Sequence, residues 1–352
     1  MTSFKVSSGQ PITALKDAAI AFFASDTFFY VVKRLLQAVL TLLLASMLSF
    51  AIIQLAPGDY LDALRQNPAI SQETLEQYNQ QFGLDRHPIE QYSRWLWQIL
   101  SQGDFGQSFV YNRKVADLLW ERIPNTLLLS IASLVITWAI AIPLGILGAL
   151  KQNGTVDRVL QVISYTGQGF PSLITALLLL FVAQITSPVF PVGGMTSIYH
   201  DQLTPFGKMI DIGWHMILPT LALSITSFAG LQRITRGQLL DVLRQDYIQT
   251  ARAKGLPENR VIYVHALRNA INPLITILGF EFSSLLGGAF IAETFFNWPG
   301  LGRLILQAVQ SQDLYLVMGS LMMGAVMLIL GNLLADLLLK AVDPRIKLGA
   351  DD

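Results

Sequence analysis

A carboxylate stands inside an apolar stretch of this chain, where ionised groups are rare. Glu281 lies near the middle of residues 273–292, and Ser284 and Gly288 follow it at helical spacing on the same face. A charge at that depth in a bilayer costs about 2.5–3.5 kcal/mol on insertion scales, so it is expected to face a cavity or a partner group. Glu281 is therefore a candidate for lining a translocation path. A structural hydrogen bond with a partner chain and burial in the protonated form are the alternatives.

Other positions near apolar stretches are candidates for the same path. Ser284 and Gly288 could line it, although small residues at this spacing are explained more simply by close helix packing. Glu293, at the outer end of the stretch, is a candidate gate or helix-capping contact. Gln168, beside Gly169, could loosen another helix next to the path, and a packing kink is the alternative.

Several chemistries are excluded by what the sequence lacks. The chain has no cysteine, which removes disulfides, thiolate metal sites and a cysteine nucleophile. It has no G-x-x-x-x-G-K-[ST] and no H-E-x-x-H, so neither P-loop ATP hydrolysis nor that class of zinc chemistry is expected. The four histidines are scattered (His87, His200, His215, His265), and His200 and His215 lie near one loop. We expect no catalytic residue, no metal and no cofactor in this chain.

A basic segment separates two of the apolar stretches. Residues 233–272 hold seven Lys or Arg and three acidic residues. Residues 246–254 are predicted to form a short helix that Gly255 ends. Tyr247 and Ala251 are expected on one face of this helix, with Gly255 just beyond, so that another protein can approach closely. An ordinary cytoplasmic loop whose basic side chains meet lipid head groups is the alternative.

The elements that position these residues are membrane spans. Of the 352 residues, 52% are hydrophobic and 14% are charged, whereas soluble proteins carry about a quarter charged residues. The formal net charge is zero, so the chain lacks the basic excess that is typical of nucleic-acid-binding proteins. About 20 apolar residues cross a bilayer as a helix. Residues 1–27 form an N-terminal extension and residues 28–352 a transmembrane domain. Six stretches qualify as spans: 31–56, 126–150, 160–185, 214–231, 273–292 and 314–339.

The basic residues predict the orientation of the spans. With the N-terminus in the cytoplasm, 16 Lys and Arg fall inside and 8 fall outside. Six of those 8 lie in the long segment 57–125, and charges in long loops have little influence on orientation. Both termini and residues 233–272 are therefore predicted to be cytoplasmic, and 57–125 an external insertion. Helices are predicted within that insertion around 72–82 and 90–102, with glycines and prolines as breaks.

The basic segment carries a motif known from a transporter family. Gln249-Thr250-Ala251, followed four residues after Ala251 by Gly255, resembles the Glu-Ala-Ala-three-residues-Gly loop of ABC importer permeases. Further segments are similar to the peptide/nickel branch of that family, over roughly residues 28–344. They are 34–36 (Arg-Leu-Leu), 56–59 (Ala-Pro-Gly-Asp), 82–85 (Phe-Gly-Leu-Asp), 103–108 (Gly-Asp-Phe-Gly-Gln-Ser), 122–127 (Arg-Ile-Pro-Asn-Thr-Leu), 250–256, 265–270, 293–294 and 298–302 (Trp-Pro-Gly-Leu-Gly).

The resemblance implies an architecture and a set of partners. The fold would be all-α and polytopic, of the type I importer permease kind, in a bacterial inner (plasma) membrane. The partners would be a homologous second permease, an extracytoplasmic solute-binding protein and two cytoplasmic ABC ATPases that carry the ATP and Mg²⁺. Gln249 stands where the general pattern has Glu, which removes an acidic contact to the ATPase. The coupling residues implied are Tyr247, Gln249, Thr250, Ala251, Arg252, Ala253, Lys254 and Gly255.

The expected function is therefore one half of an alternating-access pore for ATP-driven import of di- or oligopeptides. Nickel, glutathione or an oligosaccharide are the alternative cargoes for the same machinery. A proton-driven secondary transporter with Glu281 as the relay is the alternative of another class. In each case the chain itself is not an enzyme.

Overall fold

The computed structural model describes residues 26–342 except 57, 59 and 66–70. In this part the regular structure is helical, apart from one isolated antiparallel bridge between Gln107 and Lys114. The all-α class expected from the sequence is confirmed for these residues. The helices are α2 Asp26–Leu55, α3 Tyr60–Arg65, α4 Gln72–Phe82, α5 Pro88–Gln102, α6 Val115–Leu150, α7 Thr155–Gly169, α8 Ser172–Thr186, η1 His200–Gln202, α9 Pro205–Leu243, α10 Asp246–Ala253, α11 Glu258–Arg260, η2 Val261–Ala266, α12 Leu267–Ala270, α13 Asn272–Phe295, α14 Leu301–Gln310 and α15 Leu314–Val342.

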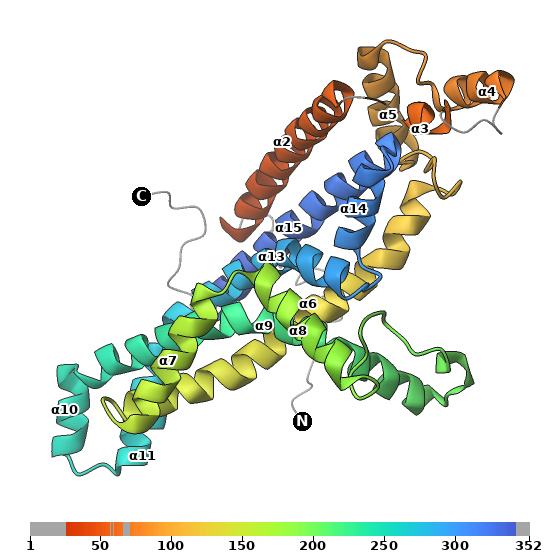
Figure 1. Ribbon diagram of the computed structural model, residues 1–352. Helices are drawn as coiled ribbons and strands as arrows, with labels where there is room; N and C mark the ends of the chain where they lie inside the picture. Colours follow the sequence, from red (N-terminus) through yellow and green to blue (C-terminus); the bar gives the residue numbers. More distant parts are fainter. Residues whose placement is uncertain (1–25, 57, 59, 66–70, 343–352) are drawn as a thin grey trace, which may run out of the picture.

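The molecule is elongated. In Figure 1 the helices α3, α4 and α5 lie at one end, α10 and α11 lie at the opposite end, and the long helices run between them. Among the described residues, α2, α6, α9 and α15 are each long and apolar enough to cross a bilayer, and α7 with α8 adds a fifth candidate if the bent pair is one span. The remaining span predicted from the sequence falls on α13, which has 24 residues. The number of crossings and the position of the termini stay predictions.

Helices α6 and α9 form the centre of the bundle. Their interface is lined by small and hydroxyl residues, which let transmembrane helices approach closely. A Cβ built on Gly145 of α6 would lie 2.6 Å from Cβ of Thr235 and 2.8 Å from the carbonyl oxygen of Gln232, both in α9. Ser133 and Ser224 bond across the same interface at 3.1 Å. No larger side chain fits at Gly145 without moving α9.

The third predicted span is two helices. The sequence predicted a continuous helix over 160–185 with a kink, whereas the structure bends by 103° between α7 and α8. Phe170 has φ −86° and ψ 124°, which is extended backbone. The residue before a proline is disfavoured in the helical region, and Pro171 follows Phe170. The break therefore has a local cause in the sequence.

The described helices of the segment predicted as an external insertion pack on the bundle. The two helices predicted in this segment are confirmed as α4 and α5. Trp95 is buried at 1% exposure and donates its indole N–H to the carbonyl oxygen of Phe105 at 3.0 Å. Phe109 is buried with it and packs against Tyr315 of α15. In contrast, Trp97 is exposed, so it is free to meet a membrane surface or another protein.

Candidate functional site

The short helix α10 is held to the bundle by one apolar face. Ile248 and Ala251 of α10 are buried together with Leu239 of α9 and Val261 of η2. Helical residues three apart share a face, so the packing of these two aims the rest of the helix outward. The short helix predicted from the sequence is confirmed, because α10 spans Asp246–Ala253.

The outward face differs from the one expected. Tyr247 is 45% exposed, whereas Ala251 is 8% exposed. Ala251 therefore packs on the bundle together with Ile248 and does not offer the small outward surface that was predicted for it. The small size of Ala251 serves contact within the chain. The exposed residues of α10 and its end are Asp246, Tyr247, Gln249, Thr250, Ala253 and Lys254.

Gly255 ends α10 through its backbone geometry. Its φ of +75° lies in the left-handed region that favours glycine. The Gly255 N–H donates to the carbonyl oxygen of Arg252 at 2.9 Å, and the Leu256 N–H donates to that of Ala251 at 3.4 Å. These bonds are of the kind that close helix C-termini. A Cβ built on Gly255 would meet no heavy atom within 4 Å, so the demand for glycine within the chain comes from φ alone.

Polar bonds brace the loop around α10. Arg252 donates from Nη2 to Glu258 Oε1 at 2.7 Å and from Nε to Oε2 at 3.2 Å. This bidentate bond lowers the pKa of the Glu258 carboxyl and raises the pKa of the Arg252 guanidinium. Asn269 donates from Nδ2 to the hydroxyl oxygen of Tyr247 at 3.0 Å. Two of the predicted coupling residues, Arg252 and Tyr247, are thus already engaged within the loop, and Lys254 is exposed.

The chain segment that leads from this loop to helix α13 is mostly helical. The π-helix η2 follows α11 and leads through α12 to α13. Val261 and Ala266 of η2 are buried in the same cluster as Ile248. Pro273 lies in the first turn of α13, where a missing N–H costs no helical hydrogen bond. The loop is therefore packed against α9 and continues into α13.

Glu281 of α13 faces α6. Trp138 of α6 donates its indole N–H to Glu281 Oε2 at 2.7 Å, and the two residues are part-buried. Glu281 thus has a hydrogen bond within this chain, whereas the alternative predicted from the sequence was a bond to a partner chain, which stays a prediction. The bond is made by one of the two carboxylate oxygens, each of which can accept hydrogen bonds.

The other candidates for the path lie on two elements, α7 and α13. Gln168 is exposed near the end of α7, next to the bend. Ser284 and Gly288 lie on α13, and their surroundings fall outside what the structure describes. Glu293 lies near the end of α13, whereas Gln168 lies on α7. A role in the path stays a prediction for each of them.

Glu293 is completely buried, with 0% exposure. Its Oε1 accepts the hydroxyl of Thr126 at 2.6 Å, and its Oε2 accepts the N–H of Gly302 at 2.7 Å and that of Arg303 at 3.2 Å. Gly302 and Arg303 are in the first turn of α14, whose N–H groups have no partner within the helix. The geometry is that of the helix-capping contact, one of the two predicted alternatives.

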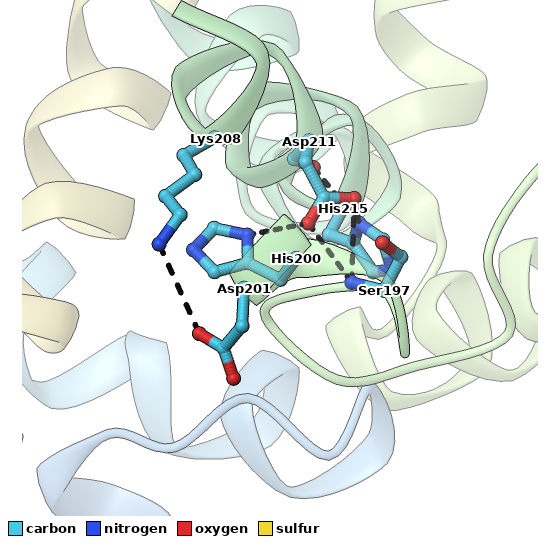
Figure 2. A network of polar contacts seen from close by, with 6 residues as sticks. All are labelled: Ser197, His200, Asp201, Lys208, Asp211 and His215. Carbon is cyan, nitrogen blue, oxygen red and sulfur yellow. Dashed lines mark hydrogen bonds and ion pairs between the residues drawn. The ribbon is translucent and has the colours of Figure 1, made fainter. Parts of the chain in front are cut away.

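Two histidines, His200 and His215, converge on one aspartate. Figure 2 shows His200 and His215 on either side of Asp211, with Nδ1 of His200 2.7 Å from Asp211 Oδ2 and Nδ1 of His215 2.8 Å from the Asp211 carbonyl oxygen. The Ser197 N–H donates to the same carboxylate at 3.0 Å. Asp211 therefore fastens the loop before α9 to that helix. Across the described ranges, no group of three His, Cys, Asp or Glu is arranged to hold a metal ion.

Sequence reasoning missed two buried carboxylates. Asp313 precedes α15 and accepts the Ser108 hydroxyl at 2.6 Å and the Val110 N–H at 3.1 Å, both from the external insertion. Asp157, near the start of α7, bonds Arg236 of α9. An aspartate directly before an apolar span is a helix-start signal, which could have identified Asp313. Its partners lie far away in the sequence, and no local pattern predicts them.

The sequence matches a described transporter family over most of its length. Residues 141–348 match the family described as "Binding-protein-dependent transport system inner membrane component". Residues 27–130 match the one described as "Binding-prot-dependent transport system membrane comp, N-term". The chain belongs to the family of binding-protein-dependent transport permeases. The family resemblance drawn from the sequence motifs is thereby confirmed.

Individual relatives of this permease carry peptide-related names. It is 40% identical to the oligopeptide transport system permease protein AppB of Bacillus subtilis, covering 90% of this chain and 99% of that one. It is 35% identical to the dipeptide transport system permease protein DppB and 36% identical to the glutathione transport system permease protein GsiC, both of Escherichia coli K12. Each comparison covers 90% of this chain and 98% of the relative. Among solved structures, the MetNI methionine ABC transporter in an inward-facing conformation is similar with a TM-score of 0.49, 16% identity and coverage of 64% of this permease and 96% of that chain.

Proposed function

We propose that this permease forms half of the pore of an ATP-driven importer for di- or oligopeptides. The outward face of α10 carries the proposal. It is a short helix held by one apolar face, closed by Gly255 and joined to α9 and α13, which is what a docking element for a partner ATPase needs. Support for the cargo comes from AppB and DppB, which are named for oligopeptides and dipeptides. Glutathione, named for GsiC, is the nearest alternative, and nickel or an oligosaccharide the more distant ones.

The proposed assembly contains a homologous second permease, two cytoplasmic ABC ATPases and an extracytoplasmic solute-binding protein. ATP and Mg²⁺ would bind to the ATPases. The permease would cross the bacterial inner membrane six times with both termini in the cytoplasm, and residues 57–125 would be external. The opposite positions of α10 and of α3, α4 and α5 in Figure 1 agree with an ATPase at one end and a binding protein at the other.

Glu281 is proposed to face the path, where its carboxylate could hold the ammonium of a peptide. The Trp138 bond fixes one oxygen of that carboxylate. A protonatable group at this depth also suits a proton-driven transporter, which is the alternative function. Uptake into proteoliposomes separates the two, because an importer needs ATP and is blocked by vanadate, whereas a proton-coupled transporter needs a pH gradient.

The proposed docking role of the outward face of α10 is tested by adding a charge at each end of the molecule. Ala253→Glu alters the exposed end of α10, and the matched control Ser101→Glu alters an exposed residue of α5 in the external insertion. Tagged complexes are purified in mild detergent and assayed for bound ATPase subunits and ATP-driven peptide uptake. We expect Ala253→Glu to lose the ATPase and uptake while the permease remains in the membrane, and Ser101→Glu to retain both. Normal uptake by Ala253→Glu would refute the assignment.

A further inference from the structure

An ion pair joins α7 to α9 near their cytoplasmic ends. Asp157 of α7 is completely buried, and Arg236 of α9 is mostly buried. Arg236 donates from Nε to Asp157 Oδ1 at 2.6 Å and from Nη2 to Oδ2 at 2.8 Å. The Asn153 N–H donates to the same carboxylate at 2.8 Å. The aspartate thus accepts bonds from Arg236 and Asn153, and the bidentate arrangement of the arginine adds rigidity to the pair.

The contact between these helices continues for three turns. Ser164 donates its hydroxyl to Gln232 Oε1 at 2.7 Å, on the same side of α9 as Arg236. Further along α7, a Cβ built on Gly167 would lie 3.4 Å from Cβ of Ala229. The residue numbers rise along α7 as they fall along α9, so the two helices are antiparallel. The ion pair therefore ends a continuous contact.

Helix α6 packs against the ion pair of Asp157 and Arg236. A Cβ built on Gly148 of α6 would lie 3.4 Å from Asp157 Oδ1, from Gln232 Nε2 and from Cδ of Arg236. These distances are ordinary van der Waals contacts, so α6 packs directly against the pair. Separating α7 from α9 would leave a buried charge without its partner, which is strongly unfavourable. These helices are therefore built to move together.

The paired helices α7 and α9 contact α10 at one end and lead to the bend before α8 at the other. At the cytoplasmic end, Leu239 of α9 packs against Ile248 of α10. At the other end, α7 stops at the 103° bend before α8. An apolar cavity of about 600 Å³ lies at this bend, with Gly167, Phe170 and Leu178 in its wall. The ion pair stands between the cytoplasmic loop and this cavity.

We propose that Asp157 and Arg236 are positioning residues that lock α7 to α9, so that a displacement of α10 reaches the bend and cavity between α7 and α8. The proposal rests on the proposed docking role of α10. It adds a route: α10 moves α9, the ion pair carries α7 along, and the bend changes the wall of the cavity. Neither residue needs to touch the cargo or the ATPase.

A covalent link between the helices tests the lock directly. The chain has no cysteine, and the Cβ positions of Gly167 and Ala229 are 3.4 Å apart, close to the roughly 3.5–4.5 Å of disulfides. The double variant Gly167→Cys/Ala229→Cys is assembled into the full complex in proteoliposomes, and ATP-driven uptake of radiolabelled trialanine is measured before and after oxidation. If α7 and α9 move as one, the oxidised form transports within about twofold of the reduced form. Loss of uptake on oxidation alone would overturn the proposal.

The same link also tests the ion pair itself. We expect Asp157→Asn to lower the peptide transported per ATP hydrolysed by about tenfold while the complex still assembles. Oxidation of Gly167→Cys/Ala229→Cys in that background is expected to restore transport, because the disulfide replaces the lock. A normal transport ratio in Asp157→Asn, or no restoration on oxidation, would overturn the role of the pair. The control is Arg113→Gln, which breaks the exposed pair of Arg113 with Glu121. If the unmutated complex shows no ATP-driven uptake, the proposed function fails, and the lock fails with it.

Discussion

The hydroxyl of Thr126 in α6 donates to Glu293 Oε1 in α13 at 2.6 Å and accepts the N–H of Leu301 at 2.8 Å. Three helices, α6, α13 and α14, therefore meet at two side chains. Glu293 completes the junction by accepting the N–H groups of Gly302 and Arg303 in the first turn of α14. Gly300, in the turn between α13 and α14, lies against this carboxylate, which leaves little room for a larger residue there.

Gly300→Ala should disrupt this junction. A Cβ at Gly300 would lie 2.1 Å from Cδ of Glu293, which no rearrangement of the methyl group can relieve. We expect the variant to lose about 1–3 kcal/mol of stability, the range for overpacking a close-packed site. Thermal unfolding of the purified permease in detergent measures this loss. Gly324→Ala is the control, because a Cβ there meets no heavy atom within 4 Å. Equal melting temperatures for the two variants would contradict the close approach.

Substitutions at Gly255 separate its two possible roles. Its φ of +75° disfavours alanine by about 1–2 kcal/mol, whereas asparagine adopts this conformation more readily. If the glycine serves only the end of α10, Gly255→Asn should transport better than Gly255→Ala. If a partner ATPase contacts the glycine itself, both variants should fail and the larger asparagine should fail more completely. ATP-driven uptake by the two variants, at matched expression, decides between these roles.

Local signals predicted some elements well. The end of α10 could be predicted because glycine at a helix end has a local cause, and the external helices α4 and α5 could be predicted from their breaks. The direction of α10 could not, because Ala251 and Tyr247 fit either face until Ile248 is known to pack on α9. A helical pattern fixes which residues share a face and leaves open which face is buried.

Long-range contacts set the rest of the structure. Arg236 and Asp157 are far apart in sequence, and the sequence around each indicates only a charged residue near the end of a span. Their pairing could therefore not be predicted. At Pro171 the sequence predicted a kink and not the large bend. Proline predicts that the helix is interrupted, whereas the angle of the bend depends on what packs beside it. Glu293 shows the same limit, because its capping role depends on the return of α14.

Asp313→Ala should release part of the external insertion. The carboxylate accepts bonds from Ser108, from the Val110 N–H and from the Leu316 N–H at 3.2 Å. Removing it leaves buried donors without partners, at a cost of about 1–3 kcal/mol. We expect faster tryptic cleavage after Arg113 in proteoliposomes with the insertion facing outward. Asp117→Ala, at an exposed residue in the first turn of α6, is the control and should not change the rate. An unchanged cleavage rate in Asp313→Ala would contradict the attachment.

The same aspartate should give stability an unusual pH dependence. Burial raises the pKa of the Asp313 carboxyl above its ordinary value, against the effect of its hydrogen bonds, of which that of Ser108 is the largest. The folded state then holds this proton more tightly than the unfolded state, so stability is lost as pH rises from about 4 through the folded pKa. Asp313→Asn removes this contribution. Unfolding curves between mildly acidic and neutral pH should therefore show the unmutated permease losing stability relative to Asp313→Asn, and the opposite trend would refute the burial effect.

Glu281 and Trp138 allow charge and hydrogen bond to be separated. Glu281→Gln keeps an oxygen that can accept the Trp138 N–H, which lies 2.7 Å from the carboxylate, and removes the charge. Trp138→Phe removes the donor and keeps the charge. If the carboxylate holds the ammonium of the cargo, Glu281→Gln should raise KM for free trialanine by about tenfold or more, because bonds to charged groups are worth about 1.5–3 kcal/mol. N-acetylated trialanine should show no such change, and Trp138→Phe should affect the two peptides equally. If Glu281→Gln instead reduces uptake of both peptides by the same factor, the carboxylate is part of the helix packing and does not bind the peptide ammonium.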